Sequence, residues 1–401
     1  MSDEISVKDD EIDHALTREI LATLAGAGFA LYGICRAQET SHRAHFTQWL
    51  AEVGCGEMTY LTQHIEQRMN PQEFVPTARS IICVADRYAS GGPEETFNQT
   101  RANAVLEKNV VSHTHEHIIN AKDTDVDKNK FTSPRGRIAR YARGRDYHRV
   151  IRERLEPIAN DLRKRFPGHR FRVCVDTAPI LEREHAQRAG LGRVGKHTLL
   201  IGEQSVGSWI VLGEIVTSLN LAPSEPVAGD PCATCTRCID ACPTQAIEPW
   251  KLHPERCISY LTIEHRSAPA KWFENRSDDW LFGCDACVEA CPHSQPSQRS
   301  ALVKPNPNYE ARHSDFDLAD VLQWTKSSQA ELKLSQALLR AKLSMWKRNA
   351  LLIVSGTRAQ SWSPHLVAAL AHLQADVGED AWLREFAAQL LRTHCAISDQ
   401  G

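Results

Sequence analysis

The chain has 401 residues, of which 42% are hydrophobic, and it carries a formal net charge of −3. This length is too great for a bare electron-transfer domain and allows two or three domains with a substantial core. The charge gives no global attraction to nucleic acid, and no apolar run approaches the roughly 18 residues of a membrane span, which excludes a transmembrane protein.

The region up to residue 222 is expected to be a mixed α/β domain. Residues 11–27 show the helical spacing of apolar side chains, with glycine following. Short apolar runs predict strands at 29–35, 80–85, 171–175, 198–201 and 208–216. Residues 89–133 are polar and contain Gly-Gly-Pro, so we expect a long surface loop or a partly disordered insertion there.

A strongly basic stretch follows this insertion. Residues 135–172 contain thirteen Arg or Lys side chains but only four acidic ones. Such a run is typical either of a solvated helix face or of a surface that binds a polyanion. The residues alone leave both interpretations open.

Asp176 is the first candidate for chemistry. It ends an apolar strand, the position at which an α/β sheet delivers side chains to its crevice. A carboxyl group there, partly removed from water, would have a raised pKa and could act as a proton donor. The alternative is that Asp176 caps the N-terminus of a helix over the following Ala-Pro-Ile-Leu-Glu.

A nearby glycine pattern is less informative. Gly190, Gly192 and Gly195 match the spacing of dinucleotide-binding loops. They precede their apolar strand, however, whereas a dinucleotide-binding loop follows it. We therefore do not predict NAD binding there.

Two cysteine runs form the strongest pattern in the chain. Each run ends in Cys-Pro; the first holds Cys232, Cys235, Cys238 and Cys242, and the second holds Cys284, Cys287 and Cys291. This is the spacing of a two-cluster bacterial ferredoxin, in which the cysteine before proline binds the neighbouring 4Fe-4S cluster. The pattern therefore predicts two 4Fe-4S clusters.

The same pattern predicts which cysteines bind together. Cys232, Cys235 and Cys238 should take Cys291 as their fourth ligand. Cys284 and Cys287 should take Cys242 and still need one more thiolate. Cys257 lies between the two runs and is the candidate, so that eight cysteines supply two complete sites.

Zinc knuckles and disulfides are the alternatives to clusters. Cys-x2-Cys pairs also bind structural zinc, but zinc sites have no use for the third cysteine or for Cys-Pro. The odd total of thirteen cysteines and the start Met-Ser-Asp-Glu-Ile, which lacks a basic and apolar signal sequence, disfavour a disulfide framework. We therefore expect a reduced, cytoplasmic protein.

The chain beyond the cysteines is expected to be helical. Residues 223–230 read as a linker into a cluster domain at 223–303, and Lys-Pro-Asn-Pro-Asn leads from it into 304–401. Two sets of apolar side chains, each sharing one helix face, predict paired helices like those of an α-solenoid: Leu366, Leu370 and Leu373, then Leu383, Phe386 and Leu390.

Five ordered motifs resemble the epoxyqueuosine reductase family. They are Arg-Tyr-Ala-Arg-Gly-x-Asp-Tyr-His, Val-Asp-Thr-Ala-Pro-x-x-Glu-Arg, Gly-Leu-Gly-x-x-Gly-Lys, Gly-Ser-Trp-x-x-Leu-Gly-Glu-Ile and the twin cysteine runs. The resemblance extends from about residue 17 to the C-terminal helices. It implies a cobalamin-binding α/β domain at 1–222, a ferredoxin-like two-cluster domain and a small HEAT-like helical domain. The activity it implies is reductive removal of the epoxide oxygen of epoxyqueuosine at the wobble position of tRNA.

The resemblance also implies roles for individual residues. Asp176 would be the proton donor, and Asp146, His148 and Arg183 would lie around the substrate. Ala139, Asp176 and Asp285 would lie against the corrin ring of cobalamin, Ala139 through its backbone. His148 is assigned to the substrate because the chain lacks an Asp-x-His-x-x-Gly cobalt-ligand motif.

The expected partners follow from this activity. A tRNA substrate would explain the basic stretch, because tRNA is a polyanion. We expect a monomer that takes electrons from an external low-potential donor and binds no membrane. The alternatives are a reductive dehalogenase, which also joins two clusters to cobalamin, and a plain electron carrier, which leaves the Asp-, His- and Arg-rich motifs unexplained.

Overall fold

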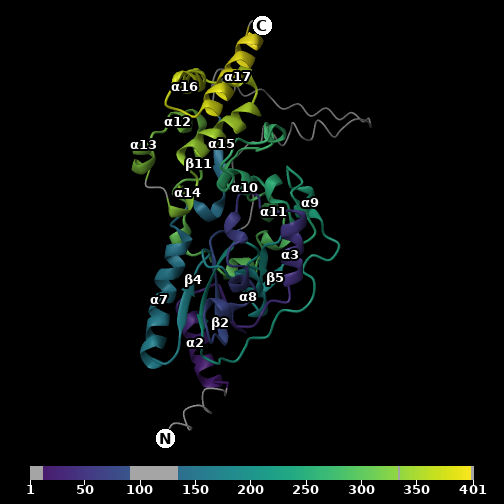
Figure 1. Cartoon of the computed structure of the whole chain (residues 1–401), viewed down its shortest axis with the longest axis vertical. Helices are drawn as coiled ribbons and strands as arrows, with labels where there is room; N and C mark the ends of the chain where they lie inside the picture. The colour runs from purple at the N-terminus through teal and green to yellow at the C-terminus, as the bar shows by residue number, and fades with distance from the viewer. Residues whose placement is uncertain (1–11, 91–133, 333–334, 399–401) are drawn as a thin grey trace.

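The computed structural model describes residues 12–90, 134–332 and 335–398 of the chain. Figure 1 shows an elongated molecule with the first sheet toward one end and the C-terminal helices at the other. The expected insertion at 89–133 lies outside the described residues from residue 91 onward.

A four-stranded sheet forms the centre of the first region. Its strands run in the order β1 (Leu31–Arg36), β2 (Ser80–Arg87), β7 (Ile210–Thr217) and β4 (Phe171–Cys174), and each neighbouring pair is antiparallel. Successive side chains of a strand point to opposite faces. Ile82 and Val84 of β2 therefore pack into one core, and Ile81 and Cys83 pack into another.

Helices cover both faces of this sheet. On one face lie α2 (His14–Gly26) and α7 (Tyr147–Arg165), and on the other lies α8 (Glu182–Arg188). Between β1 and β2 the chain forms α3 (Arg43–Glu52), the 3-10 turn η1 (Thr59–Leu61), α4 (Ile65–Met69) and α5 (Pro71–Phe74). After α8 comes a hairpin of β5 (Gly192–Val194) and β6 (Leu200–Gly202).

The expected strands and the first helix are present, with ends that differ by a few residues at most. Helix α2 begins after Asp13, whose carboxylate accepts a hydrogen bond from the Leu16 N–H at 2.7 Å. Helix α7 was not predicted, and it contains much of the basic stretch. Because the sheet is antiparallel, the crevice of parallel α/β sheets does not account for the position of Asp176.

A second sheet joins the three expected regions. Its order is β10 (Trp280–Phe282), β3 (Arg135–Ile138) and β11 (Asp315–Asp317), so each region contributes one strand. A single buried core runs from Ile138 through Phe282 to Trp346, whose ring stacks on Phe282 with centroids 5.4 Å apart. The three regions therefore share both a sheet and a core.

The cysteine-rich region consists of short elements. These are α9 (Arg237–Asp240), β8 (Ile247–Glu248), β9 (Lys251–Leu252), η3 (Pro254–Arg256), α10 (Ile258–Ile263), η4 (Lys271–Phe273), α11 (Ala286–Glu289) and η5 (Pro292–Ser294). Helix α9 contains Cys238 and helix α11 contains Cys287, and the two helices lie against each other. The two cysteine runs are thereby brought side by side.

The C-terminal region is helical, as predicted. It contains α12 (Leu318–Gln323), α13 (Lys326–Glu331), α14 (Gln336–Leu339), α15 (Leu343–Ser355), α16 (Pro364–Ala375) and α17 (Ala381–Ser398). The two expected apolar stripes are buried where α16 packs against α17 (Figure 1). Every helix in the described part of the chain is too short or too polar to cross a membrane.

Candidate active site and metal centres

The first expected set of cluster cysteines lies together. Burial, followed by the neighbouring Cys232 and Cys291 thiols and then by Cys235, raises the pKa of the Cys238 thiol to about 11. Cys291 comes from the second run and reaches across to the first, as the ferredoxin spacing predicts. These four sulfur atoms could therefore serve one metal centre.

The second set lies beside the first. Burial, followed by Cys257, raises the pKa of the Cys287 thiol, and burial followed by Cys287 raises that of Cys284. Cys242 is in turn close enough to Cys257 to contribute to the raised pKa of that thiol, after burial as the main cause. All thirteen cysteines are among the described residues, and none forms a disulfide.

Lys196 fastens the first cysteine loop to the N-terminal region. Its backbone N–H donates to the Sγ of Cys232 at 3.3 Å, and its ammonium group donates to the carbonyls of Ala233 and Cys235 at 2.7 and 3.0 Å. Hydrogen bonds to cluster sulfurs are among the features that set a reduction potential. Lys196 was not predicted as a functional residue, although the Gly-Lys motif that contains it was a signal.

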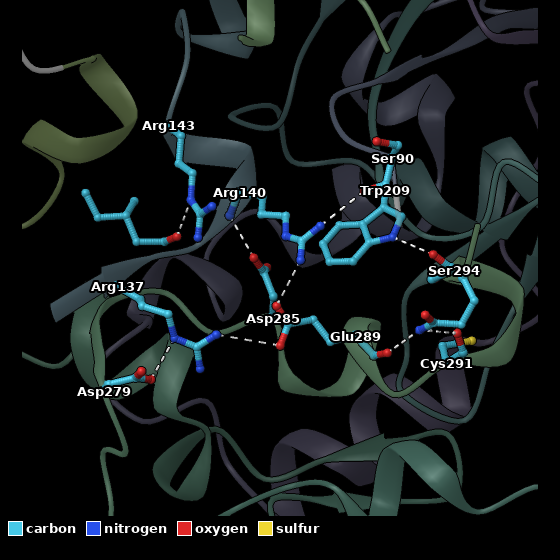
Figure 2. Close-up of polar contacts among 12 residues, drawn as sticks. Ser90, Arg137, Arg140, Arg143, Trp209, Asp279, Asp285, Glu289, Cys291 and Ser294 are labelled. Carbon is cyan, nitrogen blue, oxygen red and sulfur yellow. Dashed lines mark hydrogen bonds and ion pairs between the residues drawn. The ribbon is translucent and has the colours of Figure 1, made fainter. Parts of the chain in front are cut away.

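Arg140 connects the N-terminal region to the second cysteine run (Figure 2). Its backbone N–H donates to Oδ2 of Asp285 at 2.7 Å, and its guanidinium group pairs with Glu289 at 3.3 Å. The same guanidinium lies over the ring of Trp209, 4.5 Å from the centroid. Ala139, which precedes Arg140, is buried.

Asp285 is a buried acid. Burial raises the pKa of its carboxyl group to about 6, although the Arg140 N–H acts in the opposite direction. On the other side of Trp209, the indole N–H donates to the Ser294 carbonyl at 2.8 Å (Figure 2). The Ser208 N–H donates to Ser294 Oγ at 3.1 Å. The Gly-Ser-Trp motif thus supports the end of the second cysteine run.

Asp146, His148 and Asp176 form one hydrogen-bonded chain. Nδ1 of His148 lies 2.8 Å from Oδ1 of Asp146, and Nε2 lies 3.2 Å from Oδ2 of Asp176. Asp146 is also the N-cap of α7, since it accepts from the His148 N–H at 3.1 Å. Tyr147 stacks on the imidazole, with centroids 4.0 Å apart, and its hydroxyl bonds to Asp176.

The hydrogen bonds among Asp146, His148 and Asp176 favour a protonated His148 and a negatively charged Asp176. Burial acts to lower the pKa of His148, but Asp146 and Asp176 raise it to about 9. Burial acts to raise the pKa of Asp176, but the hydrogen bond and charge of His148, and then the charge of Arg340, hold it below its usual value. The expected raised pKa of Asp176 is therefore wrong, because the partner that lowers it is close in space and distant in sequence.

Asp176 is not a helix cap. The next helix, α8, begins at Glu182, and its N-cap position is Leu181, which makes no side-chain capping bond. The Asp176 side chain is half exposed, whereas that of His148 is about a quarter exposed. Of the pair, Asp176 is thus the member that faces outward.

Three further side chains surround Asp176. Arg183 is exposed and donates to the Thr198 carbonyl at 2.6 Å. Arg340, which follows α14, lies near enough to lower the pKa of Asp176, and its guanidinium is 5.8 Å from the ring centroid of Tyr60. Sequence reasoning missed Tyr60 and Arg340, because neither stands in a motif and they come from distant parts of the chain.

Part of the basic stretch pairs inside the molecule, so its thirteen cations do not form one polyanion-facing surface. Arg137 bonds to Asp279 at 2.7 Å and lies over the ring of Trp280, and Arg143 is buried and donates to the Ile138 carbonyl at 2.7 Å. Arg137 thereby joins the N-terminal region to the cysteine-rich region. Other cations of the stretch are exposed: Arg135, Arg149, Arg152, Lys164, Arg165, Arg170 and Arg172.

Two family models match the chain. The model "Epoxyqueuosine reductase QueG, DUF1730" matches residues 68–177, and the "4Fe-4S double cluster binding domain" matches residues 231–294. The first match includes Ala139, Asp146, His148 and Asp176. The second includes all eight candidate cluster cysteines.

Solved structures share the fold. An epoxyqueuosine reductase from Bacillus subtilis is 23% identical with a TM-score of 0.71, over 94% of this chain and 89% of that one. An epoxyqueuosine reductase bound to an epoxyqueuosine-modified tRNA-Tyr stem loop is 22% identical with a TM-score of 0.70, over 94% of this chain and 98% of that one.

Curated relatives are closer in sequence. The epoxyqueuosine reductase of Xanthomonas campestris is 35% identical over 92% of this chain and 93% of its own length. That of Pseudomonas aeruginosa is 32% identical over 92% of this chain and 89% of its own length. With such similarity along nearly its whole length, the chain belongs to the epoxyqueuosine reductase family.

Proposed function

We propose that the chain reduces epoxyqueuosine to queuosine at the wobble position of tRNA, with two 4Fe-4S clusters and cobalamin as its cofactors. The observation that carries this proposal is the outward-facing Asp176, paired with His148, in one chain with two groups of four cysteines. Loss of an epoxide oxygen as water consumes two electrons and two protons. A protonated acid–base pair and an electron path are the parts that this reaction needs.

The clusters would be held by the two cysteine groups. We assign Cys232, Cys235, Cys238 and Cys291 to one cluster, and Cys242, Cys257, Cys284 and Cys287 to the other. Cys238 of the first group and Cys242 of the second both help to raise the pKa of the Cys287 thiol, so the two groups are adjacent. An external low-potential donor would supply the electrons, and the proposed unit is a monomer.

Unpaired buried polar atoms support cobalamin as the second cofactor. Among the described residues, Nε2 of His197 and Oγ of Ser208 are buried without a hydrogen-bond partner. Cobalamin fits such atoms because amide side chains surround its corrin ring. Ala139, Asp176 and Asp285 are the other residues proposed to lie against it. When bound, cobalamin supplies a cobalt centre that accepts electrons one at a time.

The proposed proton source is the Asp176–His148 pair. The pair binds one proton at neutral pH, held mainly by the imidazole, and Asp176 is its exposed member. Transfer of this proton through Asp176 to the departing oxygen would leave a neutral His148, still hydrogen-bonded to Asp146, and a negatively charged Asp176 near the solvent-facing Arg340. We assign Asp146 to the orientation of His148, and Arg183 to the substrate.

The activity should therefore fall at alkaline pH. The pKa of His148 is raised to about 9, so its proton is bound below that pH and lost as the pH rises through it. Single-turnover rates from about pH 7 to about pH 10 should decline around pH 9. The variant His148→Gln should be slower and should lack this decline. A wild-type decline near the ordinary histidine value of about 6.5 would contradict the assignment.

The substrate is tested by comparing an epoxyqueuosine-containing anticodon stem-loop with the free nucleoside. Protein reconstituted with iron, sulfide and cobalamin should reduce the stem-loop much faster, because backbone contacts position the reacting nucleoside. Equal rates would indicate a small substrate. Comparable conversion of an organohalide would favour the dehalogenase alternative.

RNA affinity should depend on exposed cations near the acid–base pair. The side chain of Arg149 is 75% exposed on the first turn of α7, beside His148. Stem-loop affinity should fall steeply with salt, and Arg149→Glu should weaken binding and reduce the salt slope by about one unit. The matched control is Arg165→Glu at the far end of α7, where Arg165 pairs with Glu19 of α2. Equal effects of the two variants would argue against RNA contact near His148.

A further inference from the structure

The segment that carries Asp176 makes a strained turn directly after β4. The Thr177 N–H donates to the Val175 carbonyl at 2.7 Å, so that three residues close a turn centred on Asp176. The φ angle of Asp176 is +60°, in the left-handed region that side chains other than glycine rarely adopt. Such a conformation persists only where its surroundings hold it.

Glu182 is the side chain that holds this turn. Its Oε1 accepts a hydrogen bond from the Asp176 backbone N–H at 2.7 Å. Glu182 is the first residue of α8, and α8 is fixed to the central sheet by a buried pair: Nδ1 of His185 lies 3.0 Å from Oε2 of Glu214 on β7. The turn is thus tied through Glu182 and α8 to the buried central sheet of the N-terminal region.

We propose that Glu182 is a positioning residue for the reaction, which fixes the backbone of Asp176 so that its carboxylate faces His148 and the substrate. This inference rests on the proposed role of Asp176. The charge of Glu182 is consistent with it: burial, followed by Glu214 and Asp176, raises the pKa of Glu182 to about 8. A mostly protonated carboxyl group accepts the Asp176 N–H without placing a full second negative charge beside Asp176.

Two substitutions of similar size separate this role from simple packing. Glu182→Gln keeps an oxygen that accepts the Asp176 N–H, and it should keep most of the single-turnover rate on the stem-loop. Glu182→Met fills the same space without an acceptor, and it should lower that rate by about tenfold to a hundredfold, the scale of a misplaced reacting group. Glu182→Ala should behave like Met, and it serves as a second variant without the acceptor.

Glu184→Ala provides the matched control. Glu184 lies on the same helix, but its carboxylate bonds to Thr40 and pairs with Arg188. Its removal should leave the rate near that of the wild type. Iron, cobalamin and the melting temperature should be unchanged in all variants, which distinguishes a misplaced Asp176 from unfolding.

A double substitution tests whether Glu182 acts through Asp176. Adding Glu182→Met to Asp176→Asn should cause little further loss, because residues that act as one unit are not additive. A normal rate for Glu182→Met beside an impaired Asp176→Asn would overturn the positioning role alone. Fully additive losses would also overturn it. A normal rate for Asp176→Asn would remove the proposed role of Asp176 together with the inference that depends on it.

Discussion

Replacing Asp176 by Asn is expected to lower the single-turnover rate on epoxyqueuosine-containing tRNA by about a hundredfold or more, the usual scale of general acid catalysis. The amide cannot carry the proton between His148 and the departing oxygen. It also removes the negative charge that helps raise the pKa of His148. Both effects reduce the proton available at neutral pH.

The same variant should fold normally. Asp176 caps no helix, its side chain is half exposed, and Asn tolerates a positive φ angle better than most residues. Cluster content, bound cobalamin and the melting temperature should therefore match those of the wild type. A near-normal rate in a fully loaded Asp176→Asn protein would rule out Asp176 as the proton donor.

Replacing Cys257 by Ser is expected to remove one of the two clusters. Anaerobically prepared wild-type protein should contain about eight iron and eight sulfide atoms, and the variant about four of each. Cys257 lies outside both Cys-Pro runs, but Cys242 contributes to its raised pKa, and Cys257 in turn helps to raise the pKa of Cys287. A serine hydroxyl there is a poor substitute, because clusters are held by thiolates.

Cys395→Ser is the matched control for this experiment. Cys395 is exposed on α17, away from both groups of four, so its removal should leave about eight iron atoms in place. Loss of the whole iron content in Cys257→Ser would mean that the two clusters assemble together. A full complement of both clusters would show that another side chain is the eighth ligand.

The elements that sequence predicted well are those with local signals. The strand of residues 80–85 is a continuous apolar run because both of its faces are buried, and α2 follows a capping aspartate. Helix α7 was missed because its Arg and Glu side chains obscure the apolar stripe and Pro157 interrupts it. The antiparallel order of β1, β2, β7 and β4 was not predicted, because pairing depends on residues far apart in the chain.

The residues of the candidate site also divide into those with a local sequence signal and those without one. The cysteine groups could be assigned in advance, since ferredoxin spacing encodes which thiols meet. The lowered pKa of Asp176 could not be predicted in advance. It depends on His148 and on Arg340, which is 164 residues further along the chain. The basic stretch was misread for a similar reason: its Arg137 pairs with Asp279, which is far away in the sequence.

The sheet of β10, β3 and β11 has a consequence for how electrons travel. A separate ferredoxin must diffuse to its client enzyme and dock anew for every electron that it delivers. Here the segment that carries Cys284 follows β10 directly, and β10 is hydrogen-bonded to the strand that leads to Ala139. The strand that leads to Cys284 and the strand that leads to Ala139 are therefore neighbours in one sheet. A fragment cut free at residue 222 or 304 would lose a neighbouring strand and expose part of the shared core. The cysteine-rich region is therefore not a separable domain like a free ferredoxin.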